Sequence, residues 1–404
     1  MVLKDQGVIE VPRSAYADLW PLEPETVYLN HGSFGACPRE VLAEQARLRS
    51  KLEADPQGFY FEHLPALWST ALSSLASFLN ADASGMTFQV NSTSGINAVL
   101  RSLDLRADEE ILVPDHTYQA CRHAVDYACA RSGAKVVSVH LPFTASADET
   151  IARVLAGISP STRLAMVDTV CSPTAVRMPF EALTREIQDR GVDVLVDGSH
   201  GAGLLPLDLK SLDAAYVTGN CHKWLFTPKG SGFLHVRRDR RELIHPLAIS
   251  HGYSDNILPV NRFREEFDWQ GTQDPTPWLC IPFAIDYFEK VMEGGWKALM
   301  SRGYDLASYA RRLLANTVDS ADLTRLDGMT AMVSLALPPI AEHAPRDVLA
   351  VDPLMDDLYK RFGIRLIVIP WPSHGVRYLR LSAAPYNVEG DFDYLAQCLG
   401  ELGF

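Results

Sequence analysis

The feature that most constrains the fold is a series of short apolar runs in the middle of the chain. They lie at residues 111–115, 135–141, 163–170, 193–199, 214–220 and 230–237. Their residues are apolar throughout instead of alternating with polar ones, as in strands that helices cover on both faces of a sheet. The amphipathic segment 178–191, which ends at Gly191, is typical of the helices that connect such strands. The pattern predicts an α/β domain with a mostly parallel sheet.

The pattern changes after Thr276. Helical periodicity over 277–318, broken near Gly294 and Gly295, is followed by a strand-like stretch at 330–338. The remaining segments predict a helix at 352–363, strands at 364–371 and 375–382, and a final helix at 389–402. We therefore expect an N-terminal segment (1–20) that packs near a small C-terminal α+β domain (291–404), with a large α/β domain (21–290) between them.

Charge and composition argue against several classes of protein. The chain has 37 basic and 50 acidic side chains, a net charge of −13 and no basic stripe, which disfavours nucleic-acid binding. Its apolar residues are too many and too evenly spread for a disordered chain. No apolar run approaches the roughly 20 residues of a membrane helix, and residues 1–24 show no secretory signal. We expect neither nucleic-acid nor membrane partners.

The seven cysteines predict reduced thiols in a cytoplasmic protein. Their number is odd and no two of them form a CxxC motif. Disulfide frameworks and structural zinc sites need tighter clusters, so we expect no metal site.

The segment 91–103 is the first candidate for a binding site. It follows the apolar stretch 86–90 and continues as a helical pattern, which places Ser92, Thr93 and Ser94 at a helix N-terminus. Free backbone amides, hydroxyls and the positive end of the helix dipole suit a phosphate there. The alternative is an ordinary N-cap, for which serine and threonine are common.

The segment 194–203 is the second candidate. An apolar strand ends in Asp197, so its carboxylate is expected at the carboxyl edge of the sheet, where open α/β sheets bind ligands. A carboxylate there can pair with a cationic ring nitrogen, a metal or a ribose. Gly201 and Gly203 lack the third glycine of a dinucleotide-binding fingerprint. The alternative role for Asp197 is a helix cap.

The segment 214–234 is the third candidate. A predicted strand stops at a turn, and Lys223 is then followed by Trp224, Leu225 and Phe226. A lysine held among apolar groups has a lowered pKa and can act as an amine nucleophile. The alternative is a lysine whose stem packs on the apolar surface while its charge stays in water.

Taken together, the three segments predict a pyridoxal phosphate site. Lys223 would form the Schiff base with the cofactor. Asp197 would keep the pyridine nitrogen protonated, so that the ring withdraws electrons from the substrate. The helix N-terminus at 92–94 would neutralise the phosphate.

A set of longer motifs extends over nearly the whole chain. It comprises VYLNHGSFGACP (27–38), NSTSGINAV (91–99), DHTYQA (115–120), VDGSHGAG (196–203), GNCHKWL (219–225), WQGTQDPTPW (269–278) and YLRLSAAPYN (378–387). In these motifs the chain resembles the fold-type I pyridoxal phosphate enzymes of aminotransferase class V, and within them the isopenicillin N epimerase-like group. The resemblance implies a seven-stranded, mostly parallel sheet in the large domain, a small α+β domain, and pyridoxal 5′-phosphate as cofactor.

The resemblance also implies roles around the cofactor. Lys223 would be the Schiff-base lysine, Asp197 would pair with the pyridine nitrogen, and His200 would lie beside the phenolic oxygen. His116 would stack on the ring face, although Tyr118 is an alternative for that role or for supplying a proton. The phosphate would be held by Ser92, Thr93, Ser94, His222 and Thr218. Thr272 would reach the phosphate of the neighbouring subunit, which implies a homodimer.

The substrate side of the site follows from the same resemblance. Arg380 would bind the substrate α-carboxylate with both arms of its guanidinium. Asn30 and His31 would line the substrate entrance. For His31, His116 and Tyr118, a packing role is the alternative, because such amphipathic side chains often pack in cores.

The expected reaction begins at the α-carbon of an amino acid, with Lys223 as the base that removes its proton. The resemblance favours an epimerase or a β-eliminating C–S lyase, with an aminotransferase as the alternative. Cysteine desulfurases of the same class carry a persulfide-accepting cysteine shortly before the carboxylate-binding arginine. Residues 367–380 contain no cysteine, which argues against that chemistry.

Two other classes of protein remain as alternatives. A serine hydrolase would need a G-x-S-x-G elbow, and the serines at Gly32–Gly35 and Gly230–Gly232 fail that spacing. A regulator that senses pyridoxal phosphate would need room for a basic DNA-binding segment, which the chain lacks outside the expected enzyme core.

Overall fold

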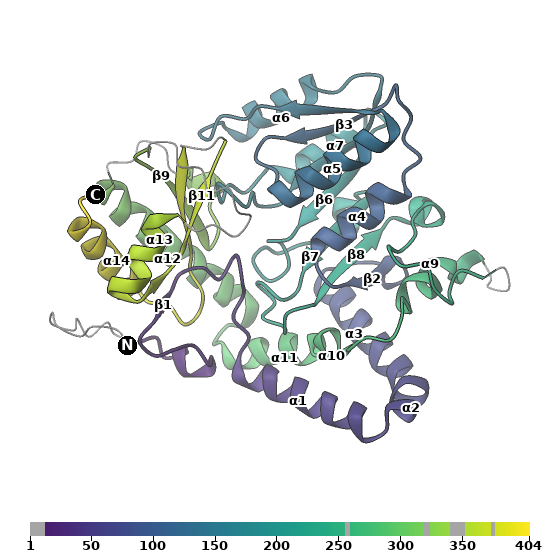
Figure 1. Cartoon of the computed structure of the whole chain (residues 1–404), viewed down its shortest axis with the longest axis horizontal. Helices are drawn as coiled ribbons and strands as arrows, with labels where there is room; N and C mark the ends of the chain where they lie inside the picture. The colour runs from purple at the N-terminus through teal and green to yellow at the C-terminus, as the bar shows by residue number, and fades with distance from the viewer. Residues whose placement is uncertain (1–12, 255–258, 319–323, 340–351, 373–375) are drawn as a thin grey trace.

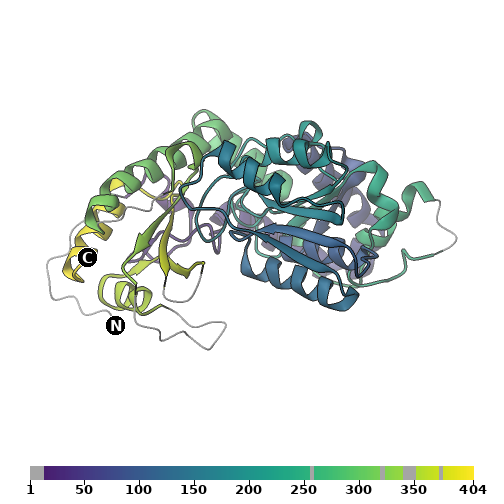
Figure 2. The same cartoon turned by 90° about the horizontal axis from the view of Figure 1, so that it is seen from above.

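The computed structural model describes residues 13–254, 259–318, 324–339, 352–372 and 376–404. Two parts lie side by side, a larger one built on a seven-stranded sheet and a smaller one built on a three-stranded antiparallel sheet (Figure 1). The long helix α12 (Gly295–Thr317) runs along the outer side of the smaller part (Figure 2). None of the described helices combines the length and apolar character that a bilayer span requires.

The larger sheet has the strand order β2-β8-β7-β6-β5-β3-β4. Its strands are β2 (Met86–Gln89), β3 (Glu110–Pro114), β4 (Lys135–Val139), β5 (Thr162–Asp168), β6 (Asp193–Gly198), β7 (Tyr216–Asn220) and β8 (Gly232–Val236). Strands β3 to β7 are mutually parallel, whereas β8 runs antiparallel to both of its neighbours, β7 and β2. The predicted α/β fold with a mostly parallel, seven-stranded sheet is confirmed.

Helices cover both faces of this sheet because successive strand residues point to opposite sides. On one face, α4 (Ser92–Ser102) and α5 (Gln119–Ser132) share a core with side chains such as Val113 and Leu195. On the other, α7 (Phe180–Gln188) packs on Val194 and Val196 with α6 (Ala147–Ala156) beside it. The run at 135–141 is less buried than the sequence predicts, because β4 is an edge strand.

The remaining helices complete the larger part and join it to the smaller one. They are α1 (Arg39–Ala54), α2 (Pro56–Gly58), a π-helical turn (Phe59–His63), α3 (Leu64–Phe78), α8 (Leu209–Leu212), α9 (Pro259–Asp268), α10 (Thr276–Leu279) and α11 (Ile281–Val291). Short 3₁₀ turns lie at Ala17–Leu19, Ala83–Gly85, Arg238–Leu243 and Leu326–Gly328. The helices α1 and α3 have no counterpart among the sequence predictions.

The smaller sheet has the order β11-β12-β9, formed by β11 (Ile367–Pro370), β12 (Arg377–Ser382) and β9 (Met332–Leu337). Helices α12, α13 (Pro353–Phe362) and α14 (Glu389–Glu401) pack with it around a separate apolar core. The single strand predicted at 364–371 is divided, because β10 (Ile364–Arg365) pairs in parallel with β1 (Val27–Tyr28) of the N-terminal region.

The N-terminal region is thereby tied to the smaller part of the molecule. Leu29 accepts a backbone hydrogen bond from Ser382 in β12, and the Ser14 hydroxyl donates to the carbonyl of Pro385 at 2.7 Å. Residues 1–12 of the predicted N-terminal segment lie outside the described residues. These contacts bring the loop after β1 to the junction between the two sheets.

The close approach of α4 to β7 generates a first prediction. A Cβ atom at Gly95 of α4 would clash with the Thr218 hydroxyl of β7. We expect Gly95→Ala to destabilise the protein by about 1–3 kcal/mol, as overpacking does in cores, measured as the free energy of unfolding in urea. Gly400→Ala in α14 is the control, because its Cβ would meet nothing within 4 Å and alanine favours a helix by up to about 1 kcal/mol. Equal effects of the two changes would contradict the close approach.

Candidate active site

Several of the predicted site residues lie at the carboxyl edge of the larger sheet. Asp197 lies near the end of β6, directly in register with Thr218 of β7, and Lys223 follows β7 in a tight turn. Helix α4 begins beside the end of β2, and its first residues contact β7 and β8. Parallel strands end at the same edge, so residues distant in sequence meet there.

Lys223 points its amine at a histidine instead of a carboxylate. Its Nζ lies 3.3 Å from Nε2 of His200. Burial, together with the positive charge of Arg380, lowers the pKa of Lys223 to about 8. A substantial fraction of the amine is therefore neutral near physiological pH, as a nucleophile or base requires.

The tautomer of His200 follows from its other neighbour. The indole Nε1–H of Trp224 is a donor only, and it lies 3.2 Å from His200 Nδ1, which must accept. The proton of the neutral imidazole then sits on Nε2 and faces the Lys223 amine. Burial lowers the pKa of His200 well below its usual value, which keeps the ring neutral. His200 thus presents a hydrogen-bond donor to the atom that reacts.

Asp197 is a buried carboxylate with neutral donors only. Its Oδ1 accepts from the backbone amide of Ser199 at 2.9 Å and from the Ser199 hydroxyl, and the Cys121 thiol lies 3.5 Å from its Oδ2. Among the described residues, no ion pair joins a basic side chain to Asp197. A buried carboxylate without a cation is costly, and a cationic ring nitrogen would supply the missing charge.

The N-terminus of α4 offers donors for an anion. Asn91 caps the helix by accepting from the Ser94 amide at 2.9 Å, and the Ser92 amide donates to Asn220 at 2.9 Å. The buried hydroxyl of Ser92 has no partner among the described residues. Thr93 and Ser94 lie in the first turn of α4, at the positive end of the helix dipole.

Two other predicted phosphate ligands are engaged with the backbone. His222 Nδ1 lies 2.7 Å from the carbonyl of Ser231, and burial lowers the pKa of His222 to about 4. A neighbouring phosphate would favour the charged imidazolium and oppose that shift. The Thr218 hydroxyl donates to the carbonyl of Phe233 at 3.0 Å and is fully buried beneath α4.

Arg380 enters the site from β12 of the smaller sheet. Its Nη1 donates to the carbonyl of Ser172 at 2.8 Å and to the Ser172 hydroxyl at 2.9 Å, and its Nη2 donates to the Ser33 hydroxyl and, at 3.4 Å, to Asn30 Oδ1. Its Nε is buried without a partner among the described residues. Burial lowers the pKa of Arg380 to about 10, and no carboxylate among the described residues forms an ion pair with it. Such an arginine is suited to an incoming carboxylate.

His31 lies inside the core and not at an entrance. Its Nδ1 is 2.9 Å from the Tyr386 hydroxyl, its Nε2 is 3.0 Å from the carbonyl of Lys223, and its ring is fully buried against Trp224 and Phe226. It therefore supports the backbone of the lysine from behind. Its neighbour Asn30 is also buried and faces Arg380.

His116 and Tyr118 lie between the two sheets in different environments. His116 is buried, with Nδ1 2.9 Å from Thr174 Oγ1 and Nε2 2.9 Å from the carbonyl of Leu141, and it packs edge-on against Trp371. Tyr118 is 45% exposed, which leaves its ring accessible. Thr272 is exposed on the loop after α9.

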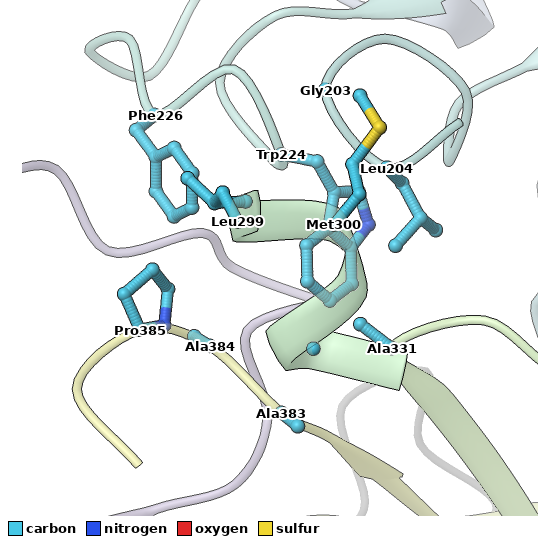
Figure 3. Close-up of a pocket in the computed structure, with 11 residues that line it drawn as sticks. Gly203, Leu204, Trp224, Phe226, Leu299, Met300, Ala331, Ala383, Ala384 and Pro385 are labelled. Atoms are coloured by element: carbon cyan, nitrogen blue, oxygen red, sulfur yellow. The ribbon is translucent and has the colours of Figure 1, made fainter. Parts of the chain in front are cut away.

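A small apolar pocket, lined in part by residues that follow Lys223 in the chain, lies between the two parts of the molecule (Figure 3). Trp224 and Phe226 contribute to it from the segment after Lys223, Met300 comes from α12, and Pro385 comes from the segment after β12. It has no charged lining residue, so it is a packing space and not the place where an amino acid would bind. No group of three or more metal-ligating side chains is placed to hold an ion in the part of the chain that the structure describes.

The aminotransferase class-V family matches residues 40–351 of this sequence. The chain belongs to that family. It is similar to isopenicillin N epimerase of Streptomyces clavuligerus (33% identity over 396 residues, 94% of this chain and 96% of the relative). It is also similar to putative L-cysteine desulfhydrase 1 of Oryza sativa subsp. japonica (30% identity over 409 residues, 93% and 82%). Class-V membership confirms the predicted family.

Solved structures confirm the fold of this class-V chain. The cystine C–S lyase C-DES, in complex with its product cysteine persulfide, superposes with a TM-score of 0.81 at 20% identity, covering 94% of this chain and 98% of that one. The cofactor of the class-V chain is pyridoxal 5′-phosphate. The residues of the site fit this cofactor. Asp197, which has no cationic partner among the described residues, suits the ring nitrogen. Lys223, with its lowered pKa, suits the aldehyde, and the N-terminus of α4 suits the phosphate.

Sequence reasoning missed three contributors to this class-V site. Ser33 and Ser172 engage Arg380, and Asp168, which is 2% exposed, lies in register with Asp197 at the end of β5. The sequence could have pointed to Asp168, because this residue, like Asp197, follows an apolar run that predicts a strand of the sheet. The serines gave none, since their approach to Arg380 depends on tertiary packing.

The lowered pKa of Lys223 predicts how cofactor attachment depends on pH. Only the neutral amine attacks an aldehyde, so the rate of attachment to cofactor-free protein should rise with pH and level off above about 8. For free lysine, with an ordinary pKa of about 10.4, the rate should still rise there. The measurement is the growth of visible absorbance, followed by borohydride reduction and peptide mapping. Label on Lys229 instead of Lys223, or no plateau, would contradict the assignment.

Proposed function

We propose that the protein acts at the α-carbon of an amino acid as an epimerase or a β-eliminating C–S lyase. The observation that carries the proposal is the buried Arg380, which has neutral partners and an unpartnered Nε near the lysine site. A substrate α-carboxylate would supply the missing negative charge. Bound in this way, an amino acid would present its α-carbon between Arg380 and Lys223.

The residues of the site then have the following roles. The bound cofactor supplies an electron sink that acidifies the α-carbon. Lys223, with its pKa near 8, takes the α-proton as general base. His200 contacts the lysine amine through Nε2, and Asp197 would pair with the pyridine nitrogen of the cofactor. His116 or Tyr118 would cover the ring face, and Thr93, Ser94 and His222 would hold the phosphate.

The choice between outcomes is supported by the relatives and by one absence in the sequence. Two of the similar proteins are named isopenicillin N epimerase and putative L-cysteine desulfhydrase, which supports an epimerase or a C–S lyase. Residues 367–380 contain no cysteine that could carry a persulfide. We therefore favour reprotonation or β-elimination over desulfuration and over transamination.

The decisive experiment is a reaction screen with D- and L-amino acids. It follows three signals in parallel: α-proton exchange in deuterated water, release of pyruvate or ammonia, and conversion that depends on an added keto acid. We expect exchange or β-elimination without a keto acid. Dominant multiple-turnover transamination would instead make the protein an aminotransferase.

The role of Arg380 gives a mutational prediction. Arg380→Lys keeps the charge but removes the two-armed guanidinium, so kcat/KM should fall on the order of 10- to 100-fold, as expected for losing a hydrogen bond to a charged group. The absorbance of the bound cofactor should not change. Arg377→Lys on the same strand is the control, because Arg377 pairs with Asp352. Wild-type turnover by the Arg380 variant would place the carboxylate site elsewhere.

We also propose an isologous homodimer in which Thr272 serves the neighbouring site. The exposed position of Thr272 supports this arrangement. Thr272→Ala should weaken cofactor retention during dialysis while light scattering still finds a dimer. The same change at the adjacent exposed Gln273 should have no effect. A wild-type protein that is monomeric and active at assay concentration would refute the arrangement.

A further inference from the structure

The site contains a second buried carboxyl group beside Asp197. Asp168 is the last residue of β5 and pairs in register with Asp197 of β6. Paired residues of adjacent parallel strands project to the same face of a sheet. Both side chains are 2% exposed, so water does not screen one from the other.

The surroundings of this pair supply hydrogen bonds but little positive charge. The Thr117 hydroxyl donates to Asp168 Oδ2 at 3.2 Å, while Ser199 and the Cys121 thiol serve Asp197. No ion pair involves Asp168 within the described ranges of the chain. The positive charge of Lys223 acts on Asp197.

The remaining titratable neighbours do not help Asp168 to ionise. The Cys171 thiol follows β5, and the Cys121 thiol projects from α5; burial and the carboxyl groups raise the pKa of both thiols, which stay neutral. Tyr118 feels the charge of Asp197, and its pKa is raised mainly by burial. Each of these elements faces the pair with a neutral group.

Two carboxyl groups in such a place cannot both be ionised without a large cost. Burial and the negative charge of Asp197 raise the pKa of Asp168 well above its usual value. Three donors surround Asp197, whereas Asp168 accepts from the Thr117 hydroxyl and from its own backbone amide. The proton of the pair therefore belongs on Asp168.

We propose that Asp168 is a positioning residue that holds a proton beside Asp197, so that the pair offers one negative charge to the pyridine nitrogen of the cofactor. The proposal rests on the role assigned to Asp197 and is independent of the reaction that follows. A second ionised carboxylate would leave an excess negative charge in the pocket. A neutral acid fills the same space and keeps the Thr117 hydrogen bond.

The test compares the same substitution at the two positions in the holoenzyme. Asp168→Asn replaces a neutral acid with a neutral amide, so the pH titration of the bound cofactor's visible absorbance should keep its wild-type midpoint. Asp197→Asn removes the charge itself and should shift that midpoint or the absorbance maximum. A shift in the Asp168 variant that matches the Asp197 variant would overturn the proposal.

A second measurement reads the proton directly. Wild-type holoenzyme with ¹³C-labelled aspartate should show the infrared C=O stretch of a protonated carboxyl group at neutral pH, and Asp168→Asn should lose it. If that variant does not fold, Thr117→Val takes its place, because loss of the hydroxyl donor should raise the stretching frequency. Absence of a protonated carboxyl band in the wild type would refute the proposal.

Failure of this idea and failure of the proposed function give different results. The infrared and absorbance measurements need no substrate, so an unexpected reaction class leaves them unchanged. Conversely, an ionised Asp168 would leave the reaction screen and the Arg380 result standing.

Discussion

The alignment of β5, β6 and β7 in one parallel register is the constraint on which the site depends. It brings Asp168, Asp197 and Thr218 to one edge of the sheet and fixes where the turn carrying Lys223 begins. Glycines preserve the spacing, because a Cβ at Gly198 would lie 2.7 Å from the carbonyl of Thr218. A shift of one residue in the register of β5 or β6 would turn Asp168 or Asp197 toward the opposite face of the sheet.

Burial sets the chemistry of the groups gathered at that edge. Burial lowers the pKa of both Lys223 and Arg380, and neither forms an ion pair with a carboxylate in the part of the chain that the structure describes. The hydroxyls of Ser33 and Ser172 compensate the guanidinium only in part. Burial thus favours the neutral amine of Lys223, and it favours the binding of an anionic ligand by the Arg380 guanidinium.

The site is also a joint between two separate cores. Arg380 comes from the smaller sheet, Lys223 from the larger one, and His31 links the N-terminal loop to the backbone of the lysine. A movement of one part relative to the other would change the distance between the carboxylate-binding group and the base. The same scaffold suits epimerisation, elimination and transfer, because the fold supplies positions and the fate of the proton depends on details of each site.

Apolar runs and turn residues were enough to predict the α/β class and the three candidate segments that the structure brings to the carboxyl edge, because each depends on neighbours in sequence. Local pattern did not reveal the edge position of β4, the division of 364–371 into β10 and β11, or the reversal of β8, since strand order is set by long-range pairing.

The motifs singled out Lys223, Asp197 and Arg380. Only the tertiary structure placed His31 behind the lysine, fixed the proton of His200 through Trp224, and set Asp168 beside Asp197. These features depend on which buried groups are close in space, because desolvation and hydrogen bonding act between spatial neighbours whatever their separation in sequence.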